Sequence, residues 1–106
     1  MRVLFDQGTP VPLRRALTVH TVSTAFEMGW AELENGQLLT VAEAAFDVLI
    51  TTDQNLRYQQ DLSDRRLAIL VLPTTSWPVI QTYVAEVVDA VSRLRPGEFR
   101  DLTFPK

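Results

Sequence analysis

The sequence predicts an α/β protein, a three-layer α/β/α sandwich built around a four-stranded, mainly parallel sheet. The strand-like runs are apolar without polar alternation, which is typical of strands buried on both faces. Helical patterns separate these runs along the chain, as the crossovers of a parallel sheet require. The last helical pattern carries one long apolar stripe, which needs a surface to pack against. A chain of 106 residues fits one such domain, which we assign to residues 1–106.

The N-terminal strand and the helix after it have clear boundary residues. Residues 3–5 form a short apolar run that ends at Asp6, and Gly8 allows the chain to turn there. We predict that Thr9 caps the next helix through its hydroxyl. Pro10 then lies in the first turn, where its missing N–H does no harm.

The middle of the chain continues the alternation of strands and helices. Residues 19–23 predict a second strand, which is more polar and therefore nearer an edge, and residues 24–28 predict a short helix. Asn35 is predicted to cap the next helix, at residues 36–45. Apolar side chains recur in that segment at helical spacing, directly after a residue type that favours capping.

Two strongly apolar strands follow. Residues 47–52 form a nearly continuous apolar run that ends at Asp53, and residues 67–72 form the fourth predicted strand. A short helix at residues 55–62 is predicted between them. Because neither run alternates with polar residues, we expect both strands to be covered by helices on both faces.

The last helix has the clearest signals in the chain. Ser76 is predicted to cap it, Pro78 lies in its first turn, and Pro96-Gly97 ends it. Its many β-branched residues lower the helix propensity, so packing on the sheet must stabilise it. For the tail, residues 98–106, two alternatives remain open. It is an added edge strand, or an arm that contacts a second subunit in a homodimer.

Composition excludes several classes of function. Cysteine is absent, which rules out disulfides, thiolate metal sites and thiol catalysis. The net charge of -3 argues against a protein that coats DNA through bulk electrostatics. No apolar run approaches the roughly 20 residues that a membrane helix needs, and the N-terminus lacks the pattern of a signal peptide. We therefore expect a cytoplasmic protein without a membrane partner.

The candidate site follows from the predicted topology. Asp6 and Asp53 each come directly after an apolar strand, and in open α/β sheets ligands bind outside the carboxyl ends of the strands. Two carboxylates that lie close together repel each other unless a cation sits between them, and Mg²⁺ suits such a pair. The alternative is local: Asp53 caps the following helix and Asp6 accepts hydrogen bonds from turn amides.

Three segments of the chain resemble a known family. They are residues 3–6, residues 35–39 with Ala42, and residues 46–56. These segments are similar to the small PIN-like proteins, which are related to VapC-type toxin ribonucleases and are often encoded as toxin–antitoxin components. The resemblance implies a Mg²⁺- or Mn²⁺-dependent ribonuclease acting on single-stranded RNA, with an antitoxin protein as partner. Asp6 and Asp53 match two of the family's acids, which implies that they are catalytic residues and metal ligands.

The resemblance also implies a further acid near the start of the middle helix. This chain has Glu34, Asn35 and Gln37 there, and only Glu34 carries a charge. We therefore predict Glu34 as the third metal ligand, although it lies just outside the helix cap. Asn35 and Gln37 can offer a carbonyl oxygen but cannot neutralise a cation. This departure favours an alternative function, a catalytically weak or inactive PIN-like module that acts by binding an antitoxin, itself or RNA.

Asn55 and Arg57 are the candidate substrate-binding residues, because both follow shortly after Asp53. Asn55 could orient a metal-bound water, and its alternative role is a helix cap. Arg57 could contact a substrate phosphate, and its alternative role is solvated surface charge. His20 is the only histidine and has no partner motif, so we predict a structural role for it.

A third class, the phosphorylated signalling receiver, also places an aspartate after a central strand. Such a domain additionally needs an acidic pair after the first strand and a lysine near the phosphorylated aspartate. Here Gln7 follows Asp6, and the only lysine is Lys106. The sequence therefore argues against this class.

Overall fold

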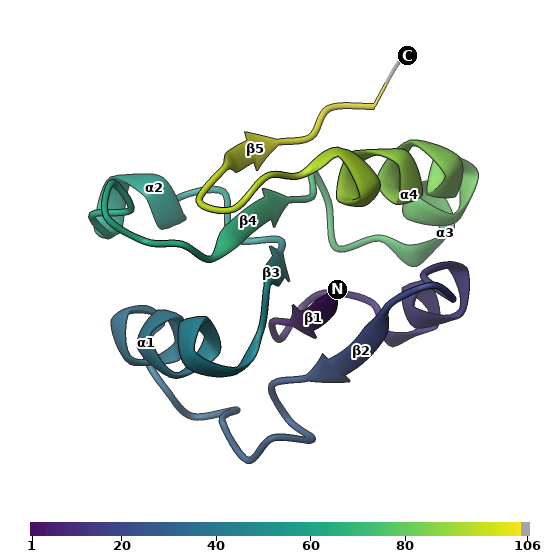
Figure 1. Ribbon diagram of the computed structural model, residues 1–106. Coiled ribbons are helices and arrows are strands. Elements are labelled where there is room, and N and C mark those ends of the chain that lie inside the picture. The colour runs from purple at the N-terminus through teal and green to yellow at the C-terminus, as the bar shows by residue number, and fades with distance from the viewer. Residues whose placement is uncertain (105–106) are drawn as a thin grey trace.

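Five strands form one sheet in which every neighbouring pair is parallel (Figure 1). The computed structural model describes residues 1–104. The strand order is β2-β1-β3-β4-β5, which confirms the predicted α/β class with a parallel sheet. The strands are β1 (Arg2–Phe5), β2 (Thr21–Thr24), β3 (Val48–Thr51), β4 (Ala68–Val71) and β5 (Phe99–Asp101).

Helices cover both faces of the sheet (Figure 1). They are the 3-10 helix η1 (Val11–Ala16) and the α-helices α1 (Asn35–Ala45), α2 (Leu56–Gln59), α3 (Trp77–Thr82) and α4 (Val84–Arg93). Buried side chains of η1, α3 and α4 belong to one core, and those of α1 and α2 belong to another. None of the helices in residues 1–104 is long and apolar enough to cross a membrane.

The strands divide their side chains between these two cores. Val3 and Phe5 of β1 face η1, α3 and α4, whereas Leu4 faces α1 and α2. All residues of β3 and β4 are buried, as the absence of polar alternation in their sequences predicts. The centre of the sheet is therefore covered on both faces. Polar side chains follow the strands at its carboxyl edge.

Two predicted helix starts are wrong. Thr9 does not cap η1, because its buried hydroxyl donates to the Ile50 carbonyl oxygen at 3.0 Å and Pro10 occupies the N-cap position. Asn35 is the first residue of α1, and Glu34 occupies the N-cap position instead. Of residues 24–28, predicted as a short helix, Thr24 ends β2 and residues 25–28 form turns.

The last predicted helix is two helices. Tyr83 separates α3 from α4 with φ −112° and ψ 26°, which are not helical angles. The predicted cap at its start is confirmed, because the Ser76 hydroxyl accepts a hydrogen bond from the Val79 N–H. Because the chain changes direction at Tyr83, both α3 and α4 contact η1.

The tail adds the fifth strand, so the predicted number of four is wrong. Its edge-strand alternative is confirmed, since β5 pairs with β4 and the Leu102 N–H donates to the Val71 carbonyl oxygen at 2.9 Å. Beyond it, the Phe104 ring stacks on Tyr83 with centroids 4.7 Å apart. Contact of the tail with a second subunit stays a prediction, and residues 105–106 lie outside the described residues.

Gly97 allows the chain to enter β5. It has φ +76°, and a Cβ at this position would lie 2.9 Å from the Arg65 carbonyl oxygen. We expect Gly97→Ala to lower the free energy of unfolding by about 2–4 kcal/mol, because an alanine adds both left-handed strain and a backbone clash. Urea denaturation measures this loss.

Gly29 provides the matched control. It has φ +77°, and nothing lies within 4 Å of the position that its Cβ would occupy. Gly29→Ala should therefore cost only the conformational strain, about 1 kcal/mol. Equal losses for the two variants would show that the approach of Arg65 does not constrain Gly97.

Candidate metal and substrate site at the carboxyl edge of the sheet

Asp6 and Asp53 lie at the carboxyl ends of the neighbouring strands β1 and β3, as predicted. The Asp6 N–H donates to the Ile50 carbonyl oxygen at 3.0 Å, which continues the pairing of the two strands by one residue. Thr51 joins the two acidic segments. Its hydroxyl donates to Asp6 Oδ2 at 2.9 Å and accepts from the Asp53 N–H at 3.1 Å.

The Thr51 side chain is completely buried, so the stability of the fold depends on whether its hydroxyl is hydrogen-bonded. A buried hydroxyl without partners costs about 1–3 kcal/mol, whereas this one has both a donor and an acceptor role filled. Thr51 was not predicted as a site residue, because residues 47–52 indicated only one apolar strand. The available signal was a hydroxyl residue at the last position of a buried strand, two residues before Asp53.

The surroundings of Asp6 change the pKa of its carboxyl group. Burial raises the pKa of Asp6, and the negative charge of Asp53 raises it further. Hydrogen bonds from the Thr51 hydroxyl and from the Gln7 N–H, at 2.8 Å, oppose this increase in the pKa. The net direction is upward, so the fold holds Asp6 in a place that disfavours its charge.

A pH-dependent stability follows from this pKa. The folded protein binds a proton at Asp6 more tightly than the unfolded chain, whose ordinary value is 3.8. The contribution of Asp6 to stability is therefore most favourable below that value, and it decreases as the pH rises through the raised folded pKa. We expect the free energy of unfolding of the wild type, minus that of Asp6→Asn, to decrease as the pH rises from about 3.5 to about 7. Urea denaturation across this range measures the difference, and a difference independent of pH would contradict the raised pKa.

Asp53 is held by two donors on its two oxygens. Asp53 Oδ2 accepts from Asn35 Nδ2 at 2.9 Å, and Asp53 Oδ1 accepts from the Asn55 N–H at 2.9 Å. The local alternative is present for Asp6, which accepts from the Gln7 N–H, whereas Asp53 accepts from the Asn55 N–H but does not cap α2, whose N-cap is Asn55. An ionised carboxylate has about four lone-pair positions, so these bonds leave room for a cation on both residues.

Asn35 occupies the position beside Asp53 where a further acid was expected. Its Nδ2 donates both to Asp53 Oδ2 and to Gln59 Oε1, the latter at 3.3 Å. Asn35 thereby connects the start of α1 with α2 and with the acidic pair. An amide at this place orients Asp53 but adds no negative charge to the site.

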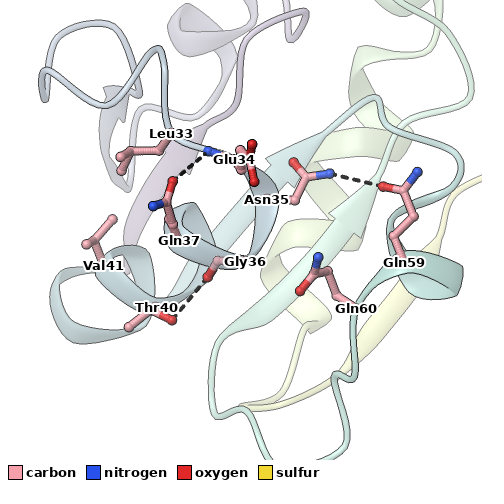
Figure 2. A pocket seen from close by; sticks show the side chains of 9 residues that line it. All are labelled: Leu33, Glu34, Asn35, Gly36, Gln37, Thr40, Val41, Gln59 and Gln60. Atoms are coloured by element: carbon pink, nitrogen blue, oxygen red, sulfur yellow. Dashed lines mark hydrogen bonds between the residues drawn. The ribbon is translucent and has the colours of Figure 1, made fainter.

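Glu34 is not brought to the aspartates. It is exposed at the N-cap of α1, where its N–H donates to Gln37 Oε1 at 3.2 Å (Figure 2). Residues 1–104 contain no group of three or more His, Cys, Asp or Glu side chains that could hold a metal ion. The site therefore has two acids and one amide where three acids were predicted.

The two residues predicted to bind substrate, Asn55 and Arg57, make other contacts. Asn55 is exposed at the N-cap of α2 without a capping bond from its side chain. Arg57 pairs with Asp101 at 2.9 Å and lies over the Phe99 ring, with its guanidinium carbon 5.2 Å from the centroid. Arg57 is thus directed toward β5, where Asp101 offsets its charge.

His20 lies at the amino ends of β1 and β2, opposite the carboxyl ends that Asp6 and Asp53 follow. It precedes β2, and its Nδ1 lies 3.2 Å from the N-terminal amine of Met1. Burial lowers the pKa of His20, and the charge of the amine lowers it further. These contacts agree with a structural role and place the histidine away from the acidic pair.

One hollow is lined by Asp6, and a second is lined by Asn35, the residue that is bonded to Asp53. A hollow of about 350 Å³ opens at Asp6, beside Thr24 and the exposed ring of Phe26. A groove of about 980 Å³ lies between the first turn of α1 and the end of α2 (Figure 2). We call it the amide groove; its lining is formed by residues 33–37, Thr40, Val41, Gln59 and Gln60.

Comparison with known proteins assigns no family to this chain. No family model matches it, and no curated protein or solved structure does. The function is therefore inferred from the geometry of Asp6, Thr51, Asp53 and Asn35, together with the resemblance noted in the sequence.

Proposed function

We propose that this protein is a Mg²⁺- or Mn²⁺-dependent endoribonuclease of the PIN-like type that cuts single-stranded RNA, with an antitoxin as its partner. One observation carries the proposal. Two aspartates at adjacent strand ends are tied to each other through the buried hydroxyl of Thr51. A structural aspartate needs only local amides, whereas this arrangement also holds two like charges at one edge of the sheet.

The donor set is compatible with a hard divalent cation. The pKa of Asp6 is raised by burial and by the charge of Asp53, and a bound cation would offset both causes. Mg²⁺ in proteins is commonly held by one or two carboxylates and retains several waters, so Asp6 and Asp53 are sufficient ligands. When bound, such an ion supplies Lewis acidity and lowers the pKa of a coordinated water.

The residues of the chain fix the two carboxylates in place. Thr51 and the Gln7 N–H orient Asp6, and Asn35 and the Asn55 N–H orient Asp53. The hollow lined by Asp6 gives solvent access to one carboxylate of the pair, and the amide groove is lined by Asn35, which is bonded to the other. No protein nucleophile is required, because water is the attacking group in this mechanism.

Cleavage of a fluorogenic single-stranded RNA tests the proposal. Protein dialysed against a chelator should be inactive, and Mn²⁺ or Mg²⁺ should restore its activity. Cleavage that persists in the chelator, or absence of cleavage at saturating Mn²⁺, would contradict the proposal.

A second candidate function is supported by Asn35. The amide beside Asp53 and the exposed position of Glu34 leave the site with two acids, which weakens cation binding relative to three. On this alternative the chain is a catalytically weak or inactive module that binds RNA or protein. Fluorescence anisotropy separates the two functions. An RNA that binds equally well with chelator and with Mn²⁺, and that stays intact, supports the binding module.

A further inference from the structure

We propose that the amide groove binds the base of a nucleotide, in the RNA strand that the proposed function places at Asp6 and Asp53. The inference rests on that function and adds a base-recognition site to it. The groove is defined by its side chains and its volume of about 980 Å³, which is large enough for a base and part of its sugar.

The chemistry of the lining favours a neutral ligand with a hydrogen-bonding edge. Four side-chain amides line the groove, from Asn35, Gln37, Gln59 and Gln60. Asn35, Gln37 and Gln59 each use part of their amide in bonds within the protein, whereas Gln60 offers a donor and an acceptor side by side, which matches the pattern of a base edge. Among residues 1–104 no lysine or arginine lines the groove, and the exposed carboxylate of Glu34 disfavours a phosphate there.

Gln60 is the amide most available to a ligand. Within residues 1–104 its side chain has no hydrogen-bond partner, although it is half-buried. It lies against Gly36, where an added Cβ would be 3.1 Å from Gln60 Oε1. The glycine therefore allows this amide to lie close to the first turn of α1 (Figure 2).

Apolar side chains complete the binding surface. Leu33 and Val41 line the same groove and are half-buried. They offer an apolar wall for the face of a base, whereas the amides address its edge. A flat ring with polar edges satisfies both requirements better than a phosphate or a metal ion does.

Asn35 connects the groove to the acidic pair. Its Nδ2 donates to Asp53 Oδ2 and also to Gln59 Oε1 in the groove lining. In this proposal, an RNA strand bound at the acidic pair passes Asn35 and places a base in the groove. This continuity favours an RNA strand over a peptide as the occupant.

Titration of isotope-labelled protein with the four neutral nucleosides tests the inference by NMR. Nucleosides lack phosphate, so they probe the groove without the metal and without cleavage. We expect one nucleoside to shift the side-chain amide signals of Gln60 and Gln37 more than the other three do. Gln60→Leu should weaken the binding of the preferred nucleoside by about tenfold, because it removes one bidentate contact.

Gln81→Leu is the matched control. Gln81 is an exposed glutamine of α3, on the other side of the sheet from the groove, so its loss should not change nucleoside binding. Equal shifts for all four nucleosides, or no shift in the groove amides, would overturn the inference. A groove that responds only to short neutral peptides would assign it to a protein partner and would also overturn it.

The outcomes for the groove and for the proposed function are distinguishable. RNA cleavage without base-selective shifts would leave the nuclease standing and remove the base site. Base-selective binding without cleavage would retain the base site and support the binding module.

Discussion

Asp53→Asn is expected to reduce metal-dependent RNA cleavage by at least about 100-fold, because it removes one of only two charges available to hold the cation. The variant keeps the shape of the side chain, so an oxygen can still accept from the Asn55 N–H. Its new NH₂ group adds a second donor near Asn35 Nδ2, which should lower the stability by about 1 kcal/mol. The cleavage rate at saturating Mn²⁺ and the melting temperature should be measured together.

Two further variants make this result interpretable. Asp6→Asn removes the other charge and should cause a comparable loss of activity. Asp89→Asn is the control, because Asp89 lies on α4 and pairs with Arg93 at an exposed position. Its activity should stay within about twofold of the wild type. Full activity in Asp53→Asn or Asp6→Asn would show that the pair does not hold a catalytic cation.

Asn35→Asp is expected to tighten Mn²⁺ binding by at least about tenfold, because it places a third carboxylate beside Asp53. In the absence of metal the same change should destabilise the protein by about 1–3 kcal/mol. It replaces the bond from Asn35 Nδ2 to Asp53 with a repulsion between like charges. Calorimetric titration with Mn²⁺ and thermal unfolding with and without the metal measure both effects.

Gln59→Glu provides the matched control for this prediction. Gln59 Oε1 accepts from the same Asn35 Nδ2 that donates to Asp53, so the variant adds the same charge at a side chain that is not itself bonded to Asp53. It should tighten Mn²⁺ binding less than Asn35→Asp does. Equal effects of the two variants would indicate a general increase in negative potential and no ligand position at residue 35.

Much of the fold was predictable because burial dominates the central strands. β3 and β4 are buried throughout, and their unbroken apolar sequences reflect this directly. β5 was harder to predict, since Phe99-Arg100-Asp101 is an edge strand with one partner and only partial burial. Its place depends on pairing with β4 across a long separation in sequence, which local pattern cannot establish.

The candidate site was predictable at its backbone positions and not in its side-chain contacts. Asp6 and Asp53 follow from topology, because parallel strands bring their carboxyl ends to one edge. The role of Asn35 depends on how α1 packs beside α2, which places Gln59 Oε1 within hydrogen-bond distance of the same Nδ2 that donates to Asp53. A capping preference predicts only that an asparagine suits a helix start, and here Glu34 takes that position.

The most direct test of the central claim is paramagnetic NMR with Mn²⁺, which reports where a cation binds. If Asp6 and Asp53 form one cation site, substoichiometric Mn²⁺ should broaden the backbone amide signals of Gln7, Thr51 and Asn55 first. The broadening should disappear in Asp53→Asn. Signals at this edge that remain sharp, or broadening that begins at the exposed Glu34 and persists in Asp53→Asn, would contradict a metal site made by the two aspartates.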